Sequence, residues 1–96
     1  MNYYFVDAAS KEFEEAKEWY DGQLNGLVLR FHECVENCVV QILKHPRFNT
    51  EIDENIYRAN IKVFPYNLIY TIQGNDIWIV AIAHKHRRPF YWKDRA

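Results

Sequence analysis

Hydrophobic residues in the first half of the chain recur with the period of an α-helix. The first stripe, which ends near Asp21, consists of Phe13, Ala16 and Tyr20. Asp7 or Ser10 can cap this helix, and acidic residues in its first turns suit the helix dipole. A second helix is predicted from about Asn25 to Lys44, because its apolar face is continuous and Pro46 stops it. Two helices joined by so few residues pack as an antiparallel hairpin.

The second half has the pattern of β-strands, with many branched and aromatic residues. Predicted strands cover residues 56–64, 66–72 and 77–84, and a further short strand covers residues 2–6. The turn Gln73–Asp76, with Gly74 and Asn75 suited to positive φ, pairs the last two strands as a hairpin. The strand 77–84 is apolar on both faces, which places it in the interior of the sheet.

These elements predict an α+β fold of one domain, residues 1–96. An N-terminal strand, a helical hairpin and a three-stranded antiparallel meander form one sheet packed on the helices. The helices cover one face, and we expect the other face to be partly open, with the basic end of the last strand delivered there. Glu51, Asp53 and Glu54 are interpreted as a loop.

Composition fits a folded soluble protein, with 49% hydrophobic, 26% charged and 17% aromatic residues. No stretch is long and apolar enough to span a bilayer, and the N-terminus lacks the features of a signal peptide. Cys34 and Cys38 lie on successive turns of one helix, so we expect reduced thiols in a cytoplasmic protein. We expect neither a metal site nor a cofactor.

Charge divides unevenly along the chain. Residues 84–95 carry five basic side chains and one acidic one, a net charge of +4, whereas residues 1–83 sum to −5. A protein that binds nucleic acid over its whole surface is usually basic overall. We therefore expect a local basic patch on an acidic body.

The basic tail begins where a buried strand ends. It combines His84, a possible proton carrier, with the cations Lys85, Arg87 and Arg88, and then with Pro89 and three aromatic residues. Pro89 can open a helical turn through Phe90, Tyr91 and Trp92. Arg58 lies on a strand that can face the same surface. The alternative is a solvated strand end, because lysine and arginine often protect sheet edges.

Other polar residues give weaker patterns. His32 is interpreted as a surface residue and His45 as a charge at a helix C-terminus. Glu12, Glu14, Glu15 and Glu18 are interpreted as a solvated helix face. Glycine-rich phosphate loops, serine nucleophile motifs and metal triads are absent from the sequence.

Four segments, in order, resemble toxins of the RelE/ParE superfamily from bacterial type II toxin–antitoxin modules. They are EFEEAKEWYD (12–21), GLVLRFHECVENCVVQILKHP (26–46), YRANIKVFPYNLIYTI (57–72) and IWIVAIAHKHRRPFYWKDR (77–95). The last contains an H-x-x-R-x-P-x-Y-W tail similar to that of plasmid-stabilisation members named after ParE. The resemblance implies a growth-inhibiting toxin that a cognate antitoxin neutralises by wrapping over the helices and the open sheet. DNA binding to the operator would come only through the antitoxin.

The resemblance leaves three functions open. ParE-like members inhibit DNA gyrase, and on that reading Lys85, Arg87, Arg88 and Trp92 bind the target. RelE-like members are metal-independent endoribonucleases that cut mRNA on the ribosome. On that reading His84 is the general acid or base, Arg58 and Arg87 stabilise the phosphorane, and Tyr91 stacks on or orients a base. The acidic segment NTEIDENIYR and the acidic body depart from the nuclease pattern. The third possible function is that of a degenerate toxin, which only binds its antitoxin.

Overall fold

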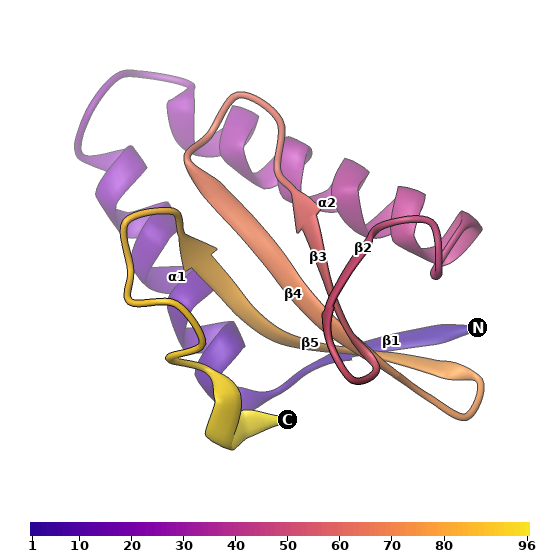
Figure 1. Ribbon diagram of the computed structural model, residues 1–96. Coiled ribbons are helices and arrows are strands. Elements are labelled where there is room, and N and C mark those ends of the chain that lie inside the picture. Colours follow the sequence, from indigo (N-terminus) through magenta and orange to yellow (C-terminus); the bar gives the residue numbers. More distant parts are fainter.

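The computed structural model describes residues 1–96 as one sheet with two helices on one of its faces (Figure 1). Its elements in chain order are β1 (Asn2–Phe5), α1 (Asp7–Asp21), α2 (Leu27–Lys44), β2 (Thr50–Asp53), β3 (Ile56–Asn60), β4 (Tyr66–Gln73), β5 (Asp76–His84) and a short 3₁₀ helix η1 (Lys93–Arg95). The predicted α+β class and the order of strand, helical hairpin and meander are confirmed.

The sheet has five strands in the order β1-β5-β4-β3-β2. The strand β1 runs parallel to β5, and the other three pairs are antiparallel. The interior position predicted for the last strand is confirmed, since β5 lies between β1 and β4. The predicted loop at Glu51 and Asp53 is wrong, because both residues belong to the edge strand β2, which pairs with β3. Charged side chains on a short edge strand are a common protection against edge-to-edge association.

The two helices begin and end close to their predicted bounds. The cap predicted for α1 is wrong: Val6 holds the N-cap position and no side chain caps the helix, although Asp7 does lie in the first turn. His45 follows the last residue of α2, just ahead of Pro46. In the turn between β4 and β5, Gly74 has a φ of +60°. Asn75, for which positive φ was also predicted, does not share it.

The main core lies between the helices and the sheet. It is dominated by rings: Phe31 of α2 packs within 5.0 Å, between ring centroids, of both Tyr20 and Phe64. Tyr70 and Leu68 of β4 are fully buried beneath them. Aromatic side chains therefore supply much of the buried area that a chain of this length needs.

A β-bulge in β5 changes which side chains face the helices. Ile69 pairs with Ala81 but the next residue, Tyr70, pairs with Ile79, so Val80 is the extra residue. As a result Ile79 and Ile82 join the main core, whereas Val80 and Ala81 both face away from the helices. The bulge thereby builds a second apolar patch on the far face of the sheet.

The C-terminal tail covers part of that far face. Trp92 is only 3% exposed and packs with Ile69, Val80 and Ala81 in a second, smaller core. In Figure 1 the yellow tail leaves β5, turns back and ends near the first turns of α1. The far face is thus less open than the sequence predicted, because Tyr91 and Trp92 fold back onto the second core.

Candidate functional site

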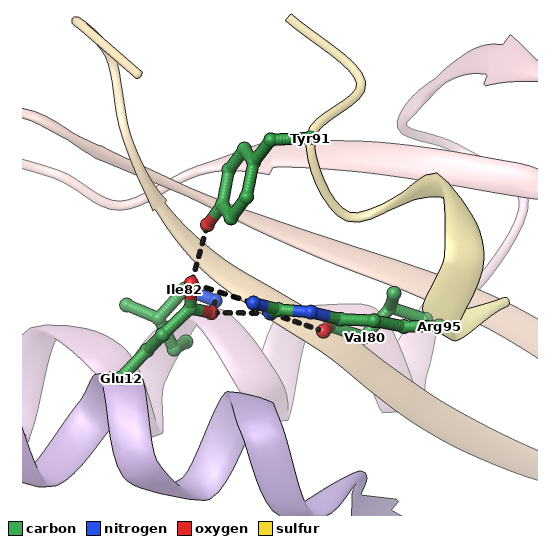
Figure 2. A network of polar contacts seen from close by, with 5 residues as sticks. All are labelled: Glu12, Val80, Ile82, Tyr91 and Arg95. Atoms are coloured by element: carbon green, nitrogen blue, oxygen red, sulfur yellow. Dashed lines mark hydrogen bonds and ion pairs between the residues drawn. The ribbon is translucent and has the colours of Figure 1, made fainter. Parts of the chain in front are cut away.

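Glu12 of α1 fastens the tail to the body of the protein. Its carboxylate accepts four hydrogen bonds: from the backbone N–H of Ile82 (3.1 Å), from the Tyr91 hydroxyl (2.6 Å) and from two Arg95 nitrogens (2.8 and 3.2 Å). Figure 2 shows these groups converging from α1, β5 and the tail. We call Glu12, Tyr91 and Arg95 the clamp. The solvated position predicted for Glu12 is wrong, because its side chain is 13% exposed.

The clamp forms hydrogen bonds with the part of the β5 edge that β1 leaves unpaired. The strand β1 pairs only with residues Asp76–Ile79, so the rest of that edge has no neighbouring strand. Glu12 accepts from the N–H of Ile82, and Arg95 donates to the carbonyl of Val80 at 3.2 Å. Two side chains thus satisfy backbone groups that would otherwise need water or another strand.

The environment of the clamp fixes the protonation of its members. Burial raises the pKa of Tyr91, and so do the hydrogen bond to Glu12 and the negative charge of that residue. The pKa of Arg95 is raised chiefly by its hydrogen bonds to Glu12. Tyr91 is therefore a neutral hydroxyl donor at physiological pH, and Arg95 is a permanent cation.

A cleft of about 400 Å³ lies on the far face of the sheet, beside the tail. All seven side chains that the sequence singled out as site candidates line it: Arg58, His84, Lys85, Arg87, Arg88, Tyr91 and Trp92. Arg58 reaches it from β3, and the other six come from the end of β5 and the tail. The fold therefore brings the candidates together, and their individual roles stay predictions.

The candidates differ in what they offer to a partner. Lys85, Arg87 and Arg88 are exposed. The guanidinium of Arg87 lies over the ring of Tyr91, with its central carbon 3.9 Å from the ring centroid. Trp92 also lines the cleft but is only 3% exposed, in the second core, so it offers little surface to a partner. Phe90, the first of the three tail aromatics, is 46% exposed and lies 5.4 Å from Trp92 between ring centroids.

His84 sits at the border between the two faces. Its ring packs edge-on against Tyr66, 5.0 Å away between centroids. Its Nδ1 accepts a hydrogen bond from the backbone N–H of His86 at 3.1 Å. An accepting Nδ1 belongs to the neutral tautomer with the proton on Nε2. His84 is the one imidazole in the lining of the cleft.

Sequence reasoning missed the roles of Glu12 and Arg95. A signal for Glu12 was present: it lies three residues after Ala9 and four before Ala16, and both of these are buried on α1. A carboxylate on a buried helical stripe needs partners, and the chain supplies a cation in its last residues. Phe90 has a φ of +61°, which no sequence pattern indicated.

A second, larger groove lies on the helical side, where α2 meets β3. It has a volume of about 720 Å³ and is lined by residues that include Cys34, Cys38, Phe48 and Asn60. Both cysteines are free, and burial raises the pKa of Cys38 to about 11. Phe48 is 87% exposed at its rim. No group of three or more histidine, cysteine or acidic side chains is placed to hold a metal ion.

Neither helix is long and apolar enough to cross a lipid bilayer.

Comparisons with known proteins agree with this architecture. The profile of a family described as the ParE toxin of the type II toxin–antitoxin system parDE matches residues 3–89. No curated protein sequence matches the chain. The chain is similar to a solved structure of the chromosomal ParDE toxin–antitoxin system from P. aeruginosa, with 12% identity, coverage of 88% of this chain and 95% of that chain, and a TM-score of 0.64.

Two further solved structures are similar in fold. The isolated E. coli RelE toxin shares 18% identity, with coverage of 96% of this chain and 92% of that chain and a TM-score of 0.63. A mutant E. coli RelE in complex with a peptide of the antitoxin RelB shares 16% identity, with coverage of 96% and 90% and a TM-score of 0.62. Since the family profile spans nearly the whole chain, the resemblance seen in the sequence motifs is confirmed, and the chain belongs to the ParE toxin family of type II toxin–antitoxin systems, within the RelE/ParE superfamily.

Proposed function

We propose that this toxin acts by binding a macromolecular target, DNA gyrase or a related enzyme, through the cationic cleft and the exposed part of the tail. The observation that carries the proposal is the state of Tyr91. Its hydroxyl donates to Glu12 at 2.6 Å, and one face of its ring is covered by Arg87. These contacts give the tyrosine of the predicted nuclease set a role in holding the tail, which supports target binding over a role in stacking on or orienting a base.

The remaining cleft residues suit recognition. Exposed arginines and an exposed aromatic ring are the side chains that most often dominate the binding energy of protein interfaces. Arg87, Arg88 and Phe90 supply both kinds within a few residues of one another. A partner with a carboxylate-rich or phosphate-rich surface would meet complementary charge there.

The acidic body supports the same reading. A nuclease that works on the ribosome benefits from long-range attraction to RNA, which an overall basic surface provides. This chain has a net charge of −1, and its positive charge is concentrated at one end. That distribution fits local docking better than attraction along a nucleic-acid backbone.

We also propose a cognate antitoxin as partner in the cytoplasm. The E. coli RelE structure in complex with a RelB antitoxin peptide supports this by analogy, since that toxin shares this fold. The groove beside α2, with Cys38 in its wall and Phe48 at its rim, offers apolar surface to such a peptide.

Two assays with purified protein test the proposal. DNA supercoiling by gyrase is followed as this protein is added, and in parallel a defined mRNA is translated and its 5′ ends are mapped. We expect inhibition of supercoiling, with the mRNA intact. Unchanged supercoiling by gyrase, together with cuts only on ribosome-bound mRNA, would overturn the proposal in favour of the nuclease.

The ribonuclease remains the second candidate because of one observation: Arg58, His84 and Arg87 all line the same cleft. Together they provide a proton carrier and two cations for a phosphorane, without a metal. If expression without antitoxin left growth unchanged, the third reading, a protein that only binds its antitoxin, would take the place of both.

A further inference from the structure

The clamp does more than hold the chain end, because one of its members supports a cleft residue. The ring of Tyr91 is fixed at one end by the hydrogen bond from its hydroxyl to Glu12, and Arg87 lies on its face at 3.9 Å. We propose that Glu12 is a positioning residue, which acts through Tyr91 to fix the direction of the Arg87 guanidinium in the cleft. The proposal rests on the proposed function in one respect, namely that Arg87 contacts the target.

The geometry favours a directed contact over simple packing. Glu12 is itself held by the N–H of Ile82, so its carboxylate is fixed with respect to β5. The Tyr91 hydroxyl has one acceptor, at 2.6 Å, and its pKa is raised, so this bond persists over the physiological range. A ring held at its tip keeps its face in one orientation. The planar Arg87 group can then stack in only a narrow range of directions.

The second cation near the ring explains why the support must be a carboxylate. The guanidinium of Arg95 lies 5.2 Å from the same ring centroid, on a side chain that pairs with Glu12. Without that negative charge, two guanidinium groups would share one ring and repel each other. Glu12 therefore neutralises Arg95 and leaves the ring face to Arg87.

The neighbouring cations lack such support, which makes them matched controls. The side chains of Lys85 and Arg88 line the cleft but make no hydrogen bond or ion pair. Long side chains of this kind keep their rotamer freedom until a partner orders them. Among the tail cations that line the cleft, Arg87 is thus the one that is oriented before binding.

The experiment is a double-mutant cycle with one spectroscopic readout. Tyr91→Phe keeps the ring and removes only its hydroxyl. Arg87→Lys keeps the charge and removes the planar group, so activity stays measurable. We expect Tyr91→Phe to weaken gyrase inhibition about fivefold in the otherwise unchanged protein, a coupling of ordinary size for contacting residues. When Tyr91→Phe is added to Arg87→Lys, we expect no additional weakening of inhibition. When it is added to Arg88→Ala, we expect the same fivefold weakening.

The second readout does not depend on the target. NMR of the whole protein can follow the Nε–H resonance of Arg87, which we expect the ring current of Tyr91 to displace, because the guanidinium lies over that ring. It should move towards the value of a free arginine in Glu12→Gln and in Tyr91→Phe, and stay in place in Arg88→Ala. The proposal would be overturned if the Arg87 resonance did not move in Glu12→Gln and Tyr91→Phe. It would also be overturned if Tyr91→Phe weakened inhibition equally in the unchanged, Arg87→Lys and Arg88→Ala proteins. If the unchanged protein did not inhibit gyrase but the resonance moved, the proposed target would fall and the positioning by Glu12 would stand. In that case the cycle is measured instead on growth inhibition in cells without antitoxin.

Discussion

The Tyr91 hydroxyl donates a hydrogen bond of 2.6 Å to Glu12, which lies 79 residues earlier in the chain. This bond joins the first helix to the tail and crosses the open part of the β5 edge. Because Arg95 and the backbone of Ile82 share the same carboxylate, a single residue of α1 connects the tail to β5. The burial of Trp92 in the second core is the other contact that holds the tail beside the cleft.

The first prediction concerns the stability that Glu12 provides. Replacing it by alanine leaves the Arg95 guanidinium and the Ile82 N–H without their partner, in surroundings that are mostly buried. We expect Glu12→Ala to lower the free energy of unfolding by about 2–4 kcal/mol. Urea unfolding followed by tryptophan fluorescence measures this. Glu14→Ala is the control, since Glu14 pairs on the surface with Lys17 and should cost less than about 0.5 kcal/mol. Equal costs for the two variants would show that the clamp adds no stability.

The second prediction separates Trp92 from Phe90. Trp92 is 3% exposed in the second core, whereas Phe90 is 46% exposed at the cleft. Trp92→Ala should destabilise the protein by about 3–5 kcal/mol, the usual cost of emptying a buried aromatic site. Phe90→Ala should change stability by less than about 1 kcal/mol and should instead weaken growth inhibition. Unfolding curves and inducer-dose growth curves for both variants check this, and the reverse assignment would place Trp92, and not Phe90, at the target interface.

The fold class, and the gathering of the candidate residues in one cleft, could both be predicted from the sequence, for identifiable reasons. The helices are amphipathic over several turns and Pro46 marks an end, so periodicity alone finds them. The strand 77–84 is continuously apolar, which indicates its interior position. The basic residues follow that strand directly, so they had to gather where it ends.

What could not be predicted depends on contacts between distant segments. The strand β2 contains alternating acids that read as a loop, and only pairing with β3 makes it a strand. The bulge at Val80 has no local signal, yet it decides which side chains face the tail. Glu12 was assigned to solvent because the partners that bury it come from the other end of the chain.

The third prediction concerns alkaline pH. Burial is the main cause that raises the pKa of Tyr91, and the same holds for Tyr20, Tyr66 and Tyr70. A tyrosine whose pKa is higher in the folded than in the unfolded state contributes to the free energy of unfolding. This contribution is fully present below pH 10, the ordinary tyrosine pKa, and is lost as pH rises through the pKa of the folded state. The free energy of unfolding should therefore fall between about pH 9 and about pH 11, with Cys38 contributing from the lower end of this range because burial raises its pKa from 9.0 to about 11.

A pair of variants isolates the share of Tyr91. Tyr91→Phe should make the fall with pH shallower, since one titrating hydroxyl is gone. Tyr3→Phe is the matched control, because the Tyr3 side chain is 45% exposed and outside both cores. Urea unfolding at several alkaline pH values measures the slopes. A Tyr91→Phe slope equal to that of the unchanged protein would contradict the assigned burial of this hydroxyl.

The fourth prediction tests whether the cleft is where the toxin acts. Arg58 is exposed on β3 and Arg87 on the tail, and they meet only in the folded cleft. Because neither side chain makes a hydrogen bond or an ion pair within the chain, Arg58→Ala and Arg87→Ala should leave the free energy of unfolding within about 0.5 kcal/mol of that of the unchanged protein. Each should weaken target inhibition by about 30-fold, the loss expected for an interface residue worth roughly 2 kcal/mol. Lys44→Ala removes the same charge at the end of α2, away from the cleft lining, and should have no effect on inhibition. If the Lys44 variant lost as much activity as the arginine variants, net charge and not the cleft would govern toxicity. The salt dependence would then be the same for all three.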